Sequence, residues 1–153
     1  MLVRMSVDIQ APPEIVWPFL VVPEKTMQWF TALKKFEYTS AQQGGPGSTF
    51  YWYEEAGGRT YNLYFETTEW KENAPFAYRM TEGDFFKSYD ERWEITKTPG
   101  GCRFTFNDHI EFPYGPLGKI IGLFAARTSQ ATGEEVLANL KRMAEAEAQL
   151  KQN

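Results

Sequence analysis

The sequence has almost none of the residues that build metal centres or disulfide-stabilised folds. Cys102 is its only cysteine and His109 its only histidine. A single cysteine excludes an internal disulfide and fits a reducing compartment, so we expect a cytoplasmic protein. A single histidine excludes a histidine-rich metal site within one chain. We therefore predict no metal and no cofactor, and we interpret Cys102 as a buried, inert thiol.

Long apolar runs and an excess of positive charge are also missing. No apolar segment approaches the roughly 20 residues of a membrane helix, so no membrane span is expected. The first ten residues alternate apolar and polar side chains, which is typical of a strand and not of a signal peptide. The net charge of −4 and the lack of a basic stripe argue against nucleic acid as a partner. The glycine-rich stretch 44–47 lacks the Lys-Ser/Thr pair of a phosphate-binding loop.

Aromatic residues, in contrast, are abundant. They make up 16% of the chain, as 12 Phe, 8 Tyr and 5 Trp. Such side chains bury a large apolar area, while Tyr and Trp keep a polar atom that needs a partner. At 153 residues the chain is long enough for one domain with a real core, and we take residues 1–153 as that domain.

Apolar alternation and turn residues predict the order of the elements. The first strand, over residues 1–10, precedes two short helices that begin near Pro12 and at Pro23. Six further strands are expected over 36–41, 48–55, 60–70, 76–81, 86–97 and 102–112. Short turns rich in Gly and Pro separate most of them, which favours antiparallel pairing between neighbours.

The last third of the chain predicts a long amphipathic helix from near Pro116 to Lys151. An apolar stripe recurs at steps of three and four, formed by Val136, Leu137, Leu140, Met143 and Ala144. The sequence 132–135 matches a capping box, so we expect a kink or break before Glu134, and fraying after about Glu145. The predicted fold is α+β, a seven-stranded antiparallel curved sheet gripping this helix.

The turns also predict which strand residues face the helix. With Pro99-Gly100 at the tip of one hairpin, Trp93 faces Phe106 and Glu91 faces Asp108 on the core side. The predicted inner face carries a set of mostly aromatic candidate ligand-binding residues: Trp52, Tyr61, Phe65, Tyr78, Met80, Tyr89, Glu91, Trp93, Phe106, Asp108 and Ile110. One helix stripe is too narrow to fill a strongly bent sheet, so we expect a cavity, on the order of 300–1,000 Å³ if it holds a ligand.

Glu91 and Asp108 leave two interpretations open. In the first interpretation, the two carboxylates lie near the mouth of the pocket, where they are solvated or form salt bridges. In the second, they are polar anchors or acid–base groups inside the pocket. Two close carboxylates cannot both ionise easily, so one pKa would rise, as a general acid requires. Asp90 and His109 pair on the outer face, where a surface ion pair is expected.

Several short segments, spread along almost the whole chain, match the sequence pattern of one protein superfamily. They are Ala11 to Trp17 after the first strand, Pro23-Glu24 leading to Trp29-Phe30, Gly47, Thr67 to Trp70 before Pro75, and Pro116-Leu117 with Leu137, Leu140, Lys141, Arg142 and Glu145. Together they resemble the helix-grip superfamily of START lipid-transfer domains, the birch-pollen allergen group and the bacterial polyketide cyclase/dehydrase proteins (SRPBCC). The resemblance implies the fold above but spans carriers, cyclases, receptors and co-chaperones. The resemblance implies no catalytic triad for this chain.

Three functions stay open at this point. The protein binds a hydrophobic or aromatic small molecule such as a lipid, quinone or polyketide-like compound. Alternatively it is a cyclase, aromatase or dehydratase in which Glu91, Asp108 or a tyrosine moves protons. As a third possibility it is an interaction module or homodimer that uses Tyr51, Tyr53 and Tyr64 on the outer sheet face.

Overall fold

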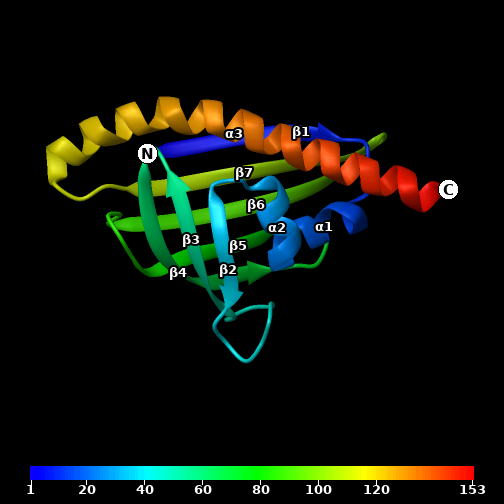
Figure 1. Ribbon diagram of the computed structural model, residues 1–153, viewed down its shortest axis with the longest axis horizontal. Coiled ribbons are helices and arrows are strands. Elements are labelled where there is room, and N and C mark those ends of the chain that lie inside the picture. The colour runs from blue at the N-terminus through cyan, green and yellow to red at the C-terminus, as the bar shows by residue number, and fades with distance from the viewer.

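The computed structural model describes residues 1–153 and confirms the predicted fold class. Seven antiparallel strands form one curled sheet in the order β1-β7-β6-β5-β4-β3-β2, with a long C-terminal helix and two short helices (Figure 1). The elements are β1 (Leu2–Ile9), α1 (Pro13–Val21), α2 (Pro23–Trp29), β2 (Leu33–Tyr38), β3 (Thr49–Ala56), β4 (Arg59–Trp70), β5 (Phe76–Gly83), β6 (Ser88–Thr98), β7 (Gly101–Glu111) and α3 (Gly115–Gln152). None of the helices combines the length and apolar character needed to cross a membrane.

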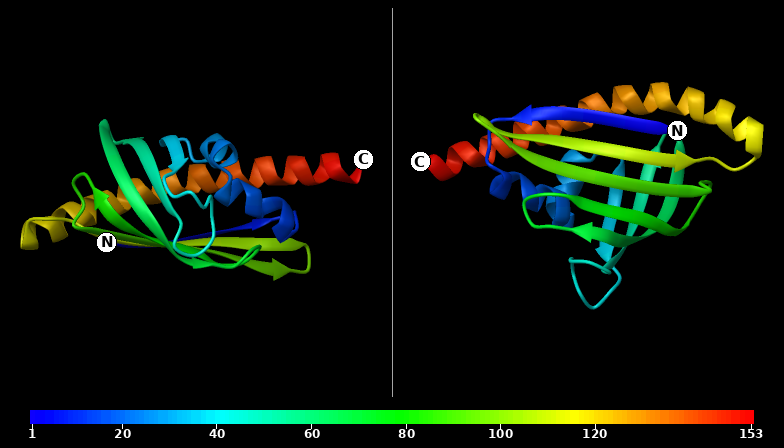
Figure 2. Two further views of the ribbon diagram at one scale, coloured as in Figure 1. Left: turned by 90° about the horizontal axis from the view of Figure 1, so that it is seen from below. Right: turned by 180° about the vertical axis from the view of Figure 1, so that it is seen from behind.

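The long helix lies along one side of the sheet's concave face. It contacts mainly β1 and reaches α1 and α2, as the views from three sides show (Figures 1 and 2). The space farther from β1 is filled in part by α2 and the residue after it. Trp29 lies 5.7 Å from Trp93 between ring centroids, and Phe30 lies 5.7 Å from Trp52. Two short-helix residues thus occupy part of the hollow that we expected the long helix to leave open.

The predicted break in the last helix was wrong. α3 is continuous from Gly115 to Gln152, and the supposed capping box lies inside it. Gly133 is buried, and a Cβ there would come within 2.6 Å of the Met5 sulfur, so this glycine permits close packing on β1. The helix also does not fray after Glu145, because Ala148 is buried and Glu147 pairs with Lys25 at 2.8 Å.

The first half of α3 extends past the edge of the sheet, as the yellow segment of Figure 1 shows. It packs through small residues, since Gly118 and Gly122 lie against the chain at Phe112 and Pro113. Its large apolar side chains are instead more than half exposed: Leu117, Ile120, Leu123 and Phe124. The predicted apolar stripe, which lies in the second half of α3, is buried at Val136, Leu137, Leu140 and Ala144, and Met143 is partly buried.

The strand registers agree with those read from the turns. Trp93 pairs with Phe106, Glu91 with Asp108, and Phe50 with Phe65. The bounds of β2 differ most from the prediction, because the strand runs from Leu33 to Tyr38 and not over 36–41. In the loop that follows, the Thr39 amide donates a hydrogen bond to the Thr49 carbonyl oxygen. Because side chains alternate between faces, these registers bring inward-pointing residues of β3 to β7 together.

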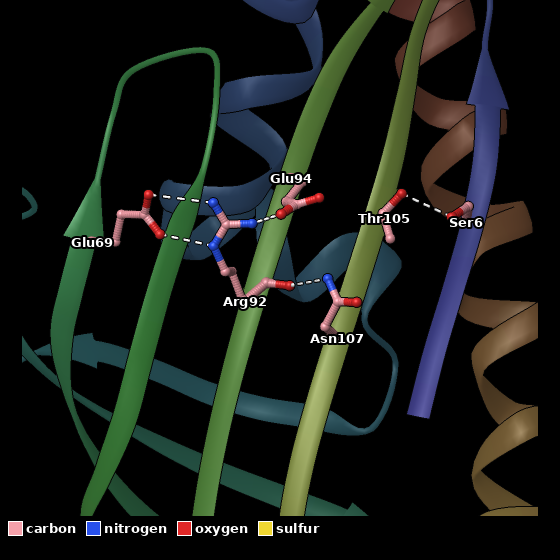
Figure 3. A network of polar contacts seen from close by, with 6 residues as sticks. All are labelled: Ser6, Glu69, Arg92, Glu94, Thr105 and Asn107. Carbon is pink, nitrogen blue, oxygen red and sulfur yellow. Dashed lines mark hydrogen bonds and ion pairs between the residues drawn. The ribbon is translucent and has the colours of Figure 1, made fainter. Parts of the chain in front are cut away.

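The outer face carries a separate polar network (Figure 3). Arg92 of β6 pairs with Glu69 of β4, at 2.8 Å across the intervening β5, and with Glu94 of its own strand, and Asn107 donates to the Arg92 carbonyl oxygen. The predicted ion pair between Asp90 and His109 was wrong. These residues are opposite in register, but Asp90 pairs with Arg79 from β5 at 2.6 Å.

A buried aromatic and acidic cluster as the candidate functional site

The centre of the concave face is a set of tightly packed rings. Trp52, Tyr78 and Trp93 come from three different strands and are each at most 1% exposed. Their ring centroids lie 5.1 Å apart for Trp52–Tyr78 and 5.7 Å apart for Tyr78–Trp93, both edge-to-face. Phe65 packs on both Trp52 and Tyr78. This arrangement is favourable for aromatic quadrupoles and builds a rigid apolar floor.

A carboxylate is held directly on this floor. Tyr89, Glu91 and Trp93 alternate along β6 and therefore share its inner face. Glu91 accepts a hydrogen bond from the Tyr89 hydroxyl at 3.0 Å and another from Trp93 Nε1, and is 6% exposed. The sequence around it thus supplies both the burial and the donors that orient the carboxyl group.

Two further carboxyls lie near Glu91. Glu54 enters from β3 and is buried, and Asp108 faces Glu91 from β7 with a buried Oδ1. None of the protein's ion pairs includes any of the three. The site therefore gathers three acidic groups in an apolar setting with no compensating cation.

Burial changes the protonation of all three carboxyls. It raises the pKa of Glu54 to about 8, and the nearby charge of Glu91 adds to this rise. Burial also raises the pKa of Glu91, against the nearby donors Tyr78, Trp93 and Tyr89, which favour its carboxylate. The pKa of Asp108 lies well above its usual range because of burial and the adjacent Glu91. In a low-dielectric interior an unpaired charge is costly, so Glu54 is mostly protonated near neutral pH, and burial favours the protonated form of the other two carboxyls.

The most informative feature is a set of buried polar atoms without hydrogen-bond partners. They are Trp52 Nε1, Glu54 Oε1, Tyr78 OH and Asp108 Oδ1. Nine in ten or more buried polar groups in proteins have a partner, and each one left alone costs about 1–3 kcal/mol. All four atoms belong to the same inward face. Two donors and two acceptors on that face therefore have no hydrogen-bond partner within the chain.

The structure places all eleven predicted site residues on the inner face. Trp52, Phe65, Tyr78, Tyr89, Glu91, Trp93 and Ile110 are buried, while Tyr61, Met80, Phe106 and Asp108 are only partly buried. Three aromatic residues form what we call the rim cluster. It consists of Tyr61, Phe86 and Phe112, with Phe86 lying 5.2 Å from Tyr61 and 5.7 Å from Phe112 between centroids. The role of the eleven predicted residues in ligand binding stays a prediction.

Sequence reasoning missed several members of this site. The Gly57-Gly58 turn predicts that Glu54 points inward, opposite Tyr61, and the register confirms this, but Glu54 was not among the candidate site residues. Phe86 and Phe112 lie at strand ends, where alternation no longer fixes a face. Trp29 is the last residue of α2, and Phe30 follows it. So short a helix has no periodic pattern that would predict which of its rings contacts the sheet.

Two depressions lie at the surface, away from the hollow, and neither is the interior cavity expected from the sequence. One, of about 340 Å³, is formed by residues 10–14, the β6–β7 turn and the end of α3. The other, of about 260 Å³, is on the outer face near Thr68, Arg92 and His109. Both are shallow and polar. The three interior carboxyls do not form a group that could hold a metal ion.

A curved antiparallel sheet that closes on a long C-terminal helix, with an aromatic and acidic interior, defines a helix-grip protein. Residues 2–145 match the family described as polyketide cyclase / dehydrase and lipid transport, and the chain belongs to this family.

Relatives in sequence and structure agree with this assignment. An uncharacterized protein of Mycobacterium tuberculosis is 29% identical over 107 residues, which are 69% of this chain and 62% of that protein. The match thus spans less than two thirds of the curated relative. A crystal structure from Thermus thermophilus is similar with a TM-score of 0.81, 21% identity and coverage of 97% of this chain and 99% of the other.

Two further solved structures carry descriptive titles. A START superfamily protein from Mycobacterium smegmatis has a TM-score of 0.77 at 18% identity, covering 95% and 97% of the two chains. The Zhui aromatase/cyclase of a Streptomyces species has a TM-score of 0.79 at 13% identity, covering 95% and 93%. At these identities the likeness establishes the fold alone.

Proposed function

We propose that the protein binds a small apolar molecule with a polar end on the concave face of its sheet. The observation that carries this proposal is the group of four unpartnered polar atoms within a wall of stacked rings. An apolar lining with a few convergent polar groups is the usual composition of a small-molecule site. The family's link to lipid transport and polyketide cyclisation supports the same class of ligand.

The rim cluster supports an entry route. Tyr61, Phe86 and Phe112 are partly exposed and continue the apolar wall from the buried rings outward. Asp108 is also only partly buried, so the acidic end of the site is not sealed from solvent. A ligand that enters past these residues would place its apolar body against the rings and its polar end at the carboxyls.

A fluorescence titration with N-phenyl-1-naphthylamine, a neutral apolar probe, tests the proposal. We expect probe emission to rise on binding and intrinsic tryptophan emission to fall, because Trp52 and Trp93 line the site. Tyr61→Ala removes a rim ring and is expected to weaken binding about five- to tenfold. Tyr64→Ala is the matched control, since Tyr64 lies on the same strand but on the outer face. Absence of probe binding, or equal losses in both variants, would reject the proposal.

An enzymatic role is the second candidate, and one observation favours it. Burial raises the pKa values of Glu91 and Asp108, which is the direction of shift that a general acid requires. If the protein catalyses cyclisation or dehydration, Glu91→Gln and Asp108→Asn should abolish turnover of a polyketide-like substrate while leaving its binding within about threefold of the wild type. A pure carrier would show no turnover in any form.

A further inference from the structure

The charges around the hollow are of one sign. Glu54 enters from β3, Tyr61 from β4, Tyr78 from β5, Tyr89 and Glu91 from β6, and Asp108 from β7. Every titratable group in this set is an acid or a phenol. No lysine, arginine or histidine pairs with any of the three carboxyls. A bound anion would add a further negative charge to a site where burial already disfavours the charged form of the carboxyls.

We propose that the ligand's polar end is a protonated amine held between Glu54 and Asp108. This inference rests on the proposed function and specifies the ligand class of the same site. Glu54 Oε1 and Asp108 Oδ1 are buried acceptors without a donor, and an ammonium group supplies up to three donors. The Tyr78 hydroxyl and Trp52 Nε1, at most 1% exposed and also unpartnered, are free to meet an acceptor atom beside that amine.

The aromatic wall suits the same ligand. Trp52, Tyr78 and Trp93 pack together on the inner face that also carries the acidic groups, and tryptophan and tyrosine rings attract cations through the negative faces of their π systems. Fatty acids and other carboxylates find no positive partner here. The site therefore selects amphiphilic or aromatic amines over acids of the same shape.

Binding of such an amine must displace protons. Glu54, whose pKa burial raises to about 8, is mostly protonated at pH 7 without ligand, and an ammonium ion favours its carboxylate form. The O–H bond of a carboxyl breaks, its proton goes to the buffer, and the resulting carboxylate accepts an N–H hydrogen bond from the amine, whose own bonds are unchanged. About one proton should leave for each amine bound at neutral pH, whereas a neutral alcohol should release none.

The test compares three probes that share one ring system: 1-naphthylmethylamine, 1-naphthylmethanol and 1-naphthoic acid. Calorimetric titration near pH 7 in two buffers of different ionisation enthalpy gives both affinity and proton release. We expect the amine to bind at least about tenfold more tightly than the alcohol and to release about one proton, and the acid to bind weakest.

Substitutions test which carboxyl causes the preference for the amine and the release of the proton. Glu54→Gln should remove most of the preference for the amine over the alcohol and reduce proton release, while the alcohol still binds. Asp108→Asn should act in the same direction. Glu55→Gln, at the exposed neighbouring position, should change neither. An alcohol or acid that binds as tightly as the amine would overturn the amine assignment and leave the proposed function intact. Failure of all three probes, together with failure of the neutral fluorescent probe, would count against the proposed function itself.

Discussion

Asp90 and Glu91 are neighbours in the chain but lie on opposite faces of the sheet. Asp90 accepts a hydrogen bond from Arg79 at 2.6 Å on the solvent side. Glu91 is buried and accepts hydrogen bonds from Tyr89 and Trp93. The two acids have almost identical chemistry, so the difference between their environments comes entirely from the period-two geometry of β6.

This pair makes a matched test of the interior cluster. Glu91→Leu leaves the Tyr89 hydroxyl and Trp93 Nε1 buried without an acceptor, and we expect it to lower the free energy of unfolding by about 2–5 kcal/mol. Asp90→Leu removes only an exposed ion pair and should cost at most about 1 kcal/mol. Urea denaturation near pH 6 measures both. Equal losses in the two variants would contradict the described position of Glu91.

The buried carboxyls also predict how stability depends on pH. Glu54 keeps its proton in the folded protein up to a pKa of about 8, whereas the unfolded chain releases it near 4.5. Between these values the folded state binds more protons, so Glu54's contribution is full below about pH 4.5 and is lost as pH rises to about 8. The shift corresponds to roughly 4–5 kcal/mol over that window.

Glu54→Gln isolates this contribution. Relative to the wild type, the variant's free energy of unfolding should rise steadily from about pH 5 to about pH 8 and then level off. Glu55→Gln serves as the control, because its side chain is exposed and its difference from the wild type should not change with pH. Denaturation curves at several pH values provide the measurement. A difference that is constant with pH in both variants would show that Glu54 is not buried as described.

The sheet was predictable because turns and alternation are local signals. Pro99-Gly100 and Gly57-Gly58 fix two hairpins, and the registers then place Trp52, Glu91, Trp93 and Asp108 inward without any tertiary information. The helix was harder. Thr132 and Gly133 look like a terminus, yet Gly133 is needed where α3 meets Met5 and Phe106, a tertiary contact that no local pattern contains.

The site itself was predictable only in part. Alternation identified which side chains point inward, but not which of them lack partners. The Trp52 ring is enclosed in part by Phe30, which follows α2, and the Tyr78 ring by Phe65 and Trp93, so these contacts exist only in the folded arrangement. The absence of a cation near Glu54 is likewise a property of the folded arrangement and not of any segment.

Tyr78→Phe should separate stability from binding. The Tyr78 hydroxyl is buried without a partner, so its removal deletes an unsatisfied group while keeping the ring. We expect the free energy of unfolding to increase by about 1–2 kcal/mol. A ligand that uses this hydroxyl should bind more weakly, as is common where stability is given up for function. Thermal unfolding and probe titration of the same variant measure the two effects, and a loss of stability would contradict the description of Tyr78.

Gly118→Ala should destabilise the start of α3 even though alanine is the better helix former. A Cβ at Gly118 would lie 2.2 Å from the backbone oxygen of Pro113, which cannot move aside as a flexible side chain would. The clash should outweigh the gain of about 1 kcal/mol in helix propensity and lower stability by about 1–3 kcal/mol. Gly100→Ala is the control, since a Cβ there meets nothing within 4 Å. Hydrogen exchange of the first turns of α3 should accelerate in the Gly118 variant alone. Unchanged exchange would mean that the helix does not pack against Pro113 as closely as its buried glycine implies.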